Sequence, residues 1–440
     1  MVDSIFFNRR QQLMQQLAPN SIALLKTAPE LRKSHDINFD YRTDPDFLYL
    51  TGYEYPDAIA IIIPKRLEGD FILFIREIDE KDHFRTGRGV TKQQAIEHYG
   101  AKQVYPMDLF VDMLPDLLDG HAHVYYSENS LNDLSTRILS AMDQLKKRMR
   151  TGTHPPSDLI NLNKLIHEMR LIKSKEEIAL LKQVAEISAK GHVRAMKNCK
   201  PKMHEYELRA EVIYEFYKHG ASDEAFHTIV AGDHNACILH YDKNDQLLKG
   251  NILVLIDAGA EYKHYSSDIS RTFPVNGHFT ANQRKLYEIV LHAQLSVIES
   301  IKPGVSIQDL QELAIYQLAD GLIKLGILSG PIASAITSNA YKRFFMHHVS
   351  HWVGMNVHDE SAYKIDGQWR MLKPNMVLTV EPGLYIPNDR DIDIKWRGIG
   401  IRIEDVILVT DKGHEVLTHH APKNPNDIEA LMRGETLIEE

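Results

Sequence analysis

Acidic residues stand within or directly after apolar, strand-like runs at three places in the carboxyl-terminal half of this chain. Asp257 follows five apolar residues, Glu381 follows the run at 376–380, and Glu404 interrupts the run at 400–408. A carboxylate in the core of a sheet is costly unless it is paired with a cation or bound to a metal ion. One such acid alone is more often a turn residue or a helix cap. Together they indicate either a structural ion-pair network or a metal site.

A fourth acid, Asp268, lies in a segment of alternating polarity. Over residues 267–274 it shares one face of an expected strand with Ser270. The buried strand that ends at Asp257 is connected to this one through residues 261–265. A hairpin centred on that connection would bring Asp257 opposite Asp268, so we expect the two carboxylates in one site.

Strand periodicity also relates Arg402 to Glu404. Residues two apart on one strand point to the same face, so both side chains are expected on one side of the sheet. A guanidinium beside a ligating carboxylate would orient that ligand or bind a carboxylate of the substrate. An ordinary surface pair of Arg and Glu is the alternative.

An imidazole completes the candidate ligand set. Four carboxylates and one histidine are oxygen-rich and suit two hard divalent cations. If they converge, four negative charges can share one site only when cations neutralise them. The chain is therefore expected to be a two-metal enzyme with the ligands Asp257, Asp268, His351, Glu381 and Glu404.

The first part of the chain has the pattern of an α/β domain. Short apolar or β-branched runs at 59–63, 71–74 and 123–126 predict buried strands. A helical pattern at 92–99 ends at a glycine and lies between two of these runs. The alternation predicts a sheet of mixed strand order.

A boundary is expected near the middle of the chain. Residues 151–158 are rich in Gly, Pro and Ser, which is typical of a connector. Ser174 followed by Glu177 has the spacing of a capping box at the start of a helix. A chain of 440 residues is too long for one ordinary domain. We therefore expect an amino-terminal domain over 1–173 and a catalytic domain over 174–440.

Composition indicates which kinds of partner and which cellular compartment to expect. The formal net charge of −9 argues against a nucleic-acid binder, which would carry a basic surface. The most apolar short run, at 58–63, is too short to span a bilayer, and the amino terminus lacks a signal-peptide core. Only Cys199 and Cys237 occur, which fits a reducing compartment. We expect a cytoplasmic protein with no membrane or nucleic-acid partner.

These residues resemble a known family, aminopeptidase P of the pita-bread metallopeptidases, over essentially the whole chain. The resemblance implies an α/β (α+β) protein with a mixed-sheet first domain and a pita-bread catalytic domain. The similar segments are DAG (257–259), DISRTFPV (268–275), EPGLY (381–385) and RGIGIRIED (397–405), with YR (41–42) and DFLYLTG (46–52) in the first domain.

The resemblance implies a role for each ligand. Asp257 would bind one metal ion through both oxygens, and Asp268 and Glu404 would bridge the pair. His351 and Glu381 would complete the shell of the other ion. The family usually takes manganese, which suits this oxygen-rich set, and Zn²⁺ and Co²⁺ remain alternatives.

Three further histidines match family positions. His240 resembles the histidine that contacts the substrate near the metals, and His358 resembles the one that holds the scissile carbonyl. His347 resembles a shuttle or positioning histidine. For each of them, a surface or core role is the alternative, since the chain has 23 histidines.

The chain departs from the family pattern at two places. His348 stands where a glycine usually follows the first histidine of the segment, which leaves the role of His347 less defined. Asp233 and His234 stand where a second glycine is usual in the loop at 230–235.

The implied reaction is hydrolysis of the first peptide bond of substrates with proline at the second position. A hydroxide shared by two metal ions would attack the carbonyl, and His358 would stabilise the oxyanion. Glu381 would carry the proton to the proline nitrogen. Tyr385 and Trp352 are candidates to line a proline pocket, with core packing as the alternative.

Two other functions remain open at this point. A prolidase uses the same metals but cleaves only Xaa-Pro dipeptides. A non-catalytic pita-bread binding module would bind no metal. The resemblance also implies self-association into a homodimer or homotetramer, with the amino-terminal domain controlling access to the site.

Overall fold

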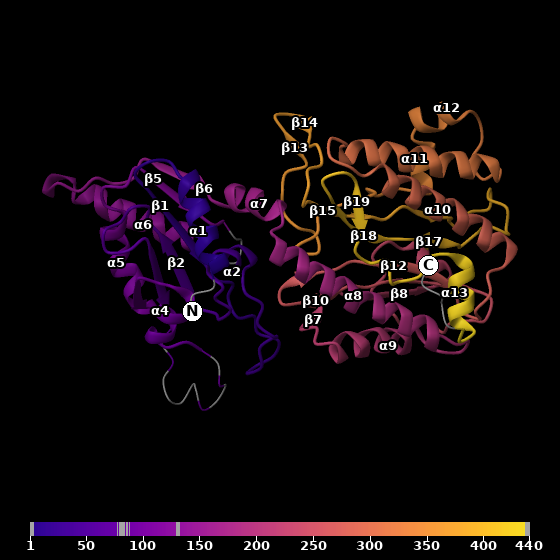
Figure 1. The fold of residues 1–440 in the computed structure, drawn as a ribbon, viewed down its shortest axis with the longest axis horizontal. Coiled ribbons are helices and arrows are strands. Elements are labelled where there is room, and N and C mark those ends of the chain that lie inside the picture. The colour runs from indigo at the N-terminus through magenta and orange to yellow at the C-terminus, as the bar shows by residue number, and fades with distance from the viewer. Residues whose placement is uncertain are drawn as a thin grey trace. The chain divides into compact units, whose positions relative to one another are not determined.

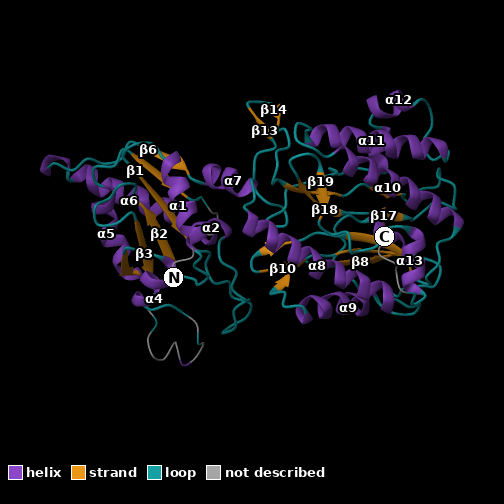
Figure 2. Cartoon of the chain, in the orientation of Figure 1, coloured by secondary structure: helices purple, strands orange, loops and turns teal. Residues whose placement is uncertain are grey.

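The computed structural model describes residues 4–435 except 77, 79–83, 85, 86, 88 and 129–132. It divides into two compact units, residues 1–170 and 171–440. The second unit begins shortly before Ser174, where the sequence predicts the start of a second domain. Figure 1 traces the chain through both units, and Figure 2 shows that helices and strands occur in each.

A six-stranded mixed sheet forms the centre of the first unit, in the order β4-β3-β2-β1-β5-β6. Pairs β1–β2 and β2–β3 are antiparallel, whereas β1–β5, β3–β4 and β5–β6 are parallel. The three strands expected from sequence are present, and the mixed order is confirmed. The strands are β1 (Ser21–Lys26), β2 (Ala58–Ile62), β3 (Phe71–Ile75), β4 (Gln103–Pro106), β5 (His123–Tyr126) and β6 (Asp158–Asn161).

Helices cover this sheet and bury its apolar side chains. The core joins Ile59, Ile61 and Phe74 of the sheet to Phe110 and Ile138 of the helices. The helix predicted at 92–99 is α4, which ends at Gly100 with a left-handed φ of 74°. The helices are α1 (Ser4–Gln16), α2 (Pro45–Thr51), α4 (Lys92–Tyr99), α5 (Phe110–Leu118), α6 (Leu134–Lys147) and α7 (Asn163–Leu171), with 3₁₀ turns η1 (Met107–Leu109) and η2 (Met149–Thr151).

In the second unit the helix pairs α8 with α9 and α10 with α11 lie on opposite sides of a central group of strands (Figure 1). The capping box at the start of α8 is confirmed, because Ser174 Oγ accepts from Glu177 N at 3.3 Å and Glu177 Oε2 accepts from Ser174 N at 2.9 Å. The helices are α8 (Lys175–Asn198), α9 (Glu205–Lys218), α10 (Ala281–Ser300), α11 (Ile307–Lys324), α12 (Ile332–Thr337) and α13 (Pro425–Met432), with 3₁₀ turns η3 (Asp233–Cys237) and η4 (Ala340–Arg343).

The strands of the second unit form small antiparallel sheets, in the orders β12-β9-β8, β15-β18-β19, β11-β10-β7, β16-β17 and β13-β14. The strands are β7 (Asp223–Glu224), β8 (Ile229–Gly232), β9 (Leu253–Asp257), β10 (Ala260–Tyr262), β11 (Tyr265–Ser266), β12 (Ser270–Pro274), β13 (Lys364–Ile365), β14 (Gln368–Trp369), β15 (Val377–Val380), β16 (Gly383–Tyr385), β17 (Gly400–Arg402), β18 (Asp405–Val409) and β19 (His414–Val416).

A helix that crosses a bilayer is long and predominantly apolar. Within the described residues, no helix combines the length and the apolar character needed to cross a membrane. Cys199 and Cys237 are both free thiols.

Candidate metal centre

The hairpin that carries Asp257 and Asp268 turns one residue later than expected. Lys263 and His264 form its two-residue turn, both with positive φ (48° and 64°), as a type I′ turn requires. Because of this shift Asp257 pairs with Ser270, and Asp268 is not its direct partner. The expectation that the two acids face each other is therefore wrong in register, although both carboxylates still reach one site.

A glycine makes room for the return strand of this hairpin. A Cβ at Gly259 would lie 1.7 Å from the backbone oxygen of Ser267. No side chain can occupy that position, so the backbone that leads into Asp268 lies directly against the residue that follows Asp257 and Ala258.

The other three candidate ligands come from the neighbouring strands. Glu381 directly follows β15, and Glu404 lies between β17 and β18. His351 is aligned beside β15, because Thr379 N donates to His351 O at 2.9 Å. Its Nδ1 lies 3.0 Å from Trp352 O. Donation of that N–H to a carbonyl leaves Nε2 as the metal-binding nitrogen.

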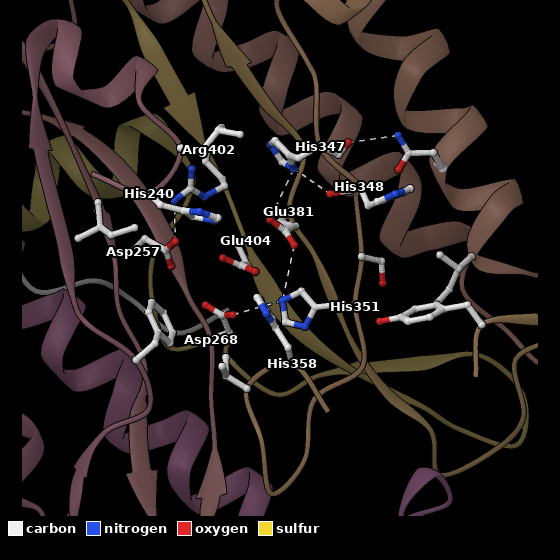
Figure 3. Close-up of a pocket in the computed structure, with 18 of the residues that line it drawn as sticks. His240, Asp257, Asp268, His347, His348, His351, His358, Glu381, Arg402 and Glu404 are labelled. Atoms are coloured by element: carbon white, nitrogen blue, oxygen red, sulfur yellow. Dashed lines mark hydrogen bonds and ion pairs between the residues drawn. The ribbon is translucent and has the colours of Figure 1, made fainter. Parts of the chain in front are cut away.

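The five side chains converge on one place (Figure 3). Ligand atoms of three residues lie within 4.8 Å of one another in several combinations. Asp268, His351 and Glu404 each take part in two combinations, so the ligand atoms offer neighbouring positions for more than one divalent ion. The combinations are Asp257 with Asp268 and Glu404, His351 with Glu381 and Glu404, and Asp268 with His351 and His358.

Charge and hydrogen bonding in this cluster fit bound cations. Burial, and then the charges of Asp257 and Glu381, raise the pKa of Asp268 well above its usual range. Burial and the charges of Asp268 and Glu381 do the same to the pKa of Glu404. The Oδ1 atoms of Asp257 and Asp268 are buried without a hydrogen-bond partner. An unpaired buried carboxylate oxygen is costly, and a divalent cation is the partner that these oxygens fit.

Arg402 ties the cluster to the surrounding hydroxyls. It donates from Nη2 to Asp257 Oδ2 at 2.6 Å, from Nε to Ser270 Oγ at 2.8 Å, and from Nη1 to Tyr385 Oη at 3.0 Å. Ser270 Oγ in turn donates to Glu404 Oε2 at 2.8 Å. The strand breaks between Arg402 and Glu404, but both side chains face the site as expected.

The histidines complete the wall of the site. His347 Nε2 lies 2.9 Å from Tyr385 Oη, and burial followed by Arg402 lowers the pKa of His347 to about 4. Burial followed by His351 lowers the pKa of His358, whose ring centroid is 4.3 Å from that of His351. His240 lines the site near Asp257 and Arg402 (Figure 3).

One cavity of about 710 Å³ is lined by all five candidate ligands and by His240, His347, His358 and Arg402. Tyr385 and Trp352 were candidates to line a proline pocket, but both are buried and neither lines the cavity. Core packing accounts for Trp352, which stacks on Tyr363 at 5.4 Å between ring centroids. The aromatic residues that do line the cavity are Phe226, Tyr241, Tyr363 and Trp369.

The two departures from the family pattern have different consequences. Asp233 takes a left-handed φ of 58°, a conformation that favours glycine and that Asp tolerates better than most residues. Neither Asp233 nor His234 lines the cavity. His348 does line it, and its backbone is not left-handed, so the imidazole fits without strain there.

Sequence reasoning missed two hydroxyl groups in this site. Ser270 was placed on the correct face of its strand but given no role, although it connects Arg402 to Glu404. Tyr385 connects His347 to Arg402. Ser is mostly exposed and Tyr is found in either environment, and no local sequence pattern identifies the partners of either hydroxyl.

Family comparisons match both units. The model described as metallopeptidase family M24 matches residues 179–411, and the model of the aminopeptidase P amino-terminal domain matches residues 6–125. Together they define the class of this protein as a metallopeptidase that carries an aminopeptidase P-type first domain.

Proteins that match over nearly the whole chain show which kind of metallopeptidase this is. The Xaa-Pro aminopeptidase of Escherichia coli strain K12 is 42% identical over 97% of both chains. The structure of Pseudomonas aeruginosa aminopeptidase PepP matches with a TM-score of 0.96 and 43% identity over 98% of both chains. A zinc-substituted E. coli aminopeptidase P in complex with product matches with a TM-score of 0.95 and 42% identity over 98% of both chains. The chain therefore belongs to the aminopeptidase P group of metallopeptidase family M24.

Membership of the aminopeptidase P group confirms three expectations from the sequence. The resemblance to aminopeptidase P is correct, the second unit is a pita-bread domain, and the protein is an enzyme of the metallo-exopeptidase class. Divalent metal binding follows from the family, and the converging carboxylates are suited to it.

Proposed function

We propose that this enzyme removes the first residue from peptides with proline in the second position and uses two divalent metal ions. The observation that carries the metal site is the pair of buried, unpartnered oxygens on Asp257 and Asp268 inside a four-carboxylate cluster. The substrate class is supported by two Xaa-Pro aminopeptidases that match this chain over nearly their full length.

The proposed ligands, which would hold the two ions, are Asp257, Asp268, His351, Glu381 and Glu404. When bound, such a pair of cations activates water for attack on a peptide carbonyl and polarises that carbonyl. Manganese is the proposed metal, since the donors are mostly carboxylate oxygens.

The surrounding residues would handle protons and charge. Glu381 would take the proton of the attacking water and deliver it to the proline nitrogen. His358 would donate to the oxygen of the scissile carbonyl as negative charge develops there. His240 would contact the substrate, and His347, held by Tyr385, would position it. Arg402 would orient Asp257.

A comparison of peptide lengths tests the substrate class. With Mn²⁺ present, an Xaa-Pro-Yaa tripeptide should release its first residue, and the matched Xaa-Pro dipeptide should not be the preferred substrate. Cleavage of the dipeptide alone would mean a prolidase. Tripeptides without proline at the second position are the control and should remain intact.

Metal stoichiometry tests the dinuclear centre separately. After chelation and dialysis, activity should disappear, and Mn²⁺ should restore it with two ions bound per chain by elemental analysis. Glu381→Gln should abolish turnover. A chain that bound no metal and still folded normally would be a binding module, and the proposed mechanism would fail.

The proposal includes a cytoplasmic location and self-association. Two free thiols suit a reducing compartment. The amino-terminal domain would build a homodimer or homotetramer that restricts access to the site. Sedimentation of the full chain and of a chain lacking residues 1–170 measures that contribution.

A further inference from the structure

The segment that carries His347 and His351 has two edges. On one edge it pairs with β15 and its extension, because Glu381 N donates to Val349 O and Thr379 N donates to His351 O, both at 2.9 Å. On the opposite edge, the N–H of Val349 and the carbonyl of His347 face helix α11.

The side-chain amide of Gln311 meets that second edge. Its Oε1 accepts from Val349 N at 2.6 Å, and its Nε2 donates to His347 O at 3.4 Å. A primary amide offers the same donor and acceptor as a peptide unit. The amide of Gln311 therefore satisfies the two backbone groups that flank His348, as the backbone of a neighbouring strand would.

Hydrogen bonds hold the first turn of α11, which precedes Gln311, in place. Ser306 and Asp309 form a capping box at its first turn. Backbone bonds join the residues before the helix to the chain after β14, with Leu372 N donating to Val305 O at 2.7 Å and a bridge between Ser306 and Met371. Gln311 lies one turn further along the helix.

We propose that Gln311 is a positioning residue that holds the backbone of His347, His348 and Val349 against helix α11. Through Val349 it supports Glu381, whose N–H binds the other side of the same residue. Through His347 it supports the contact between Nε2 and Tyr385 Oη. The effect on turnover rests on the proposed function, whereas the effect on the backbone does not.

Two substitutions separate the two hydrogen bonds. Gln311→Met keeps a similar length and removes both. Gln311→Glu keeps an acceptor for Val349 N–H and removes the donor to His347. The matched control is Gln317→Met, on the same helix but outside the cavity lining.

Hydrogen exchange of the full-length protein, read by mass spectrometry on peptides that cover residues 345–351, tests the contact without turnover. Gln311→Met should raise exchange at Val349 by about tenfold, since its N–H loses a well-aligned acceptor. Gln311→Glu and Gln317→Met should leave it near the wild-type rate. Unchanged exchange in Gln311→Met, or the same rise in Gln317→Met, would overturn the proposal.

Steady-state kinetics on the tripeptide then separate positioning from a general structural role. We expect kcat of Gln311→Met to fall about tenfold with KM changed less than about twofold, at unchanged bound Mn²⁺ and thermal midpoint. Gln311→Glu should recover most of kcat. A loss of kcat that merely follows lost metal or lost stability overturns the positioning role. If wild type itself leaves the tripeptide intact, the proposed function fails and the exchange result still decides on Gln311.

Discussion

Arg402 Nη2 donates to Asp257 Oδ2 at 2.6 Å, and both side chains are largely buried. The same guanidinium reaches Ser270 and Tyr385, so each of its three nitrogens donates a hydrogen bond. Neighbours that hold metal-binding carboxylates in place contribute to metal affinity although they do not touch the ion.

Arg402→Lys should therefore weaken Mn²⁺ binding by about 10- to 100-fold. One ammonium group cannot donate to three acceptors in the directions that the fork reaches. Calorimetric titration of the metal-free protein with Mn²⁺ measures the change in affinity. The control is Arg343→Lys, whose partners Asp389 and Asp391 are exposed. Equal affinities for the two variants would show that Arg402 does not organise Asp257.

The metal-free protein should lose stability as pH rises. Burial and the neighbouring carboxylates raise the folded-state pKa of Asp268 and Glu404 above the unfolded values of about 4. Above about pH 4 the folded state then binds more protons than the unfolded state, so the free energy of unfolding falls with pH. Bound cations remove the repulsion between ionised carboxylates.

Thermal melts of chelated and Mn²⁺-loaded protein between about pH 5 and pH 8 measure this effect. The gap between the two midpoints should widen as pH rises. Asp268→Asn should flatten the pH dependence of the chelated protein, because one of the crowded acids is then neutral. A constant gap would mean that the carboxylates are not coupled to the metal.

Three of the proposed ligands stand out in the sequence because each breaks a local rule. Asp257, Glu381 and Glu404 follow or interrupt apolar strands, a placement that is costly without a cation. The hairpin register could not be predicted, since Lys263 and His264 lack the Asn-Gly signature of their turn. A turn centre misplaced by one residue shifts every cross-strand pair by two.

The roles of uncharged hydrogen-bonding side chains in the site were harder to predict than those of charged side chains. No local sequence pattern marks an uncharged amide or hydroxyl as part of a site, so only three-dimensional contacts reveal what Gln311 and Tyr385 bind. In the first unit, β1 was missed because its short run gives only a weak strand pattern, although it lies near the centre of the sheet. Local patterns predict strands better than strand order, because order depends on distant partners.

A buried ion pair supports the loop that carries His358. Lys173 Nζ lies 3.1 Å from Asp359 Oδ2, with side-chain exposures of 1% and 3%. Lys173→Met should lower the free energy of unfolding by about 3–5 kcal/mol, because it removes the buried cation that contacts Asp359 Oδ2. Urea denaturation of the metal-free protein measures the change.

Lys182→Met is the matched control for that prediction. Its pair with Glu415 is even shorter, at 2.7 Å, but the side chains are 46% and 43% exposed. Water and salt screen such a pair, so its loss should cost less than about 1 kcal/mol. If both variants lose equal stability, burial is not what makes the Lys173 pair important.

Gly259→Ala should disrupt the hairpin that presents Asp257 and Asp268. The new Cβ would meet the Ser267 oxygen at 1.7 Å, so the backbone has to move. Overpacking against backbone costs about 3 kcal/mol or more, and the shift would separate two of the proposed ligands. Gly413→Ala, where a Cβ meets nothing within 4 Å, should change stability by less than about 1 kcal/mol. Urea denaturation and Mn²⁺ titration of both variants check this, and wild-type affinity in Gly259→Ala would show that the metal centre tolerates a shifted hairpin.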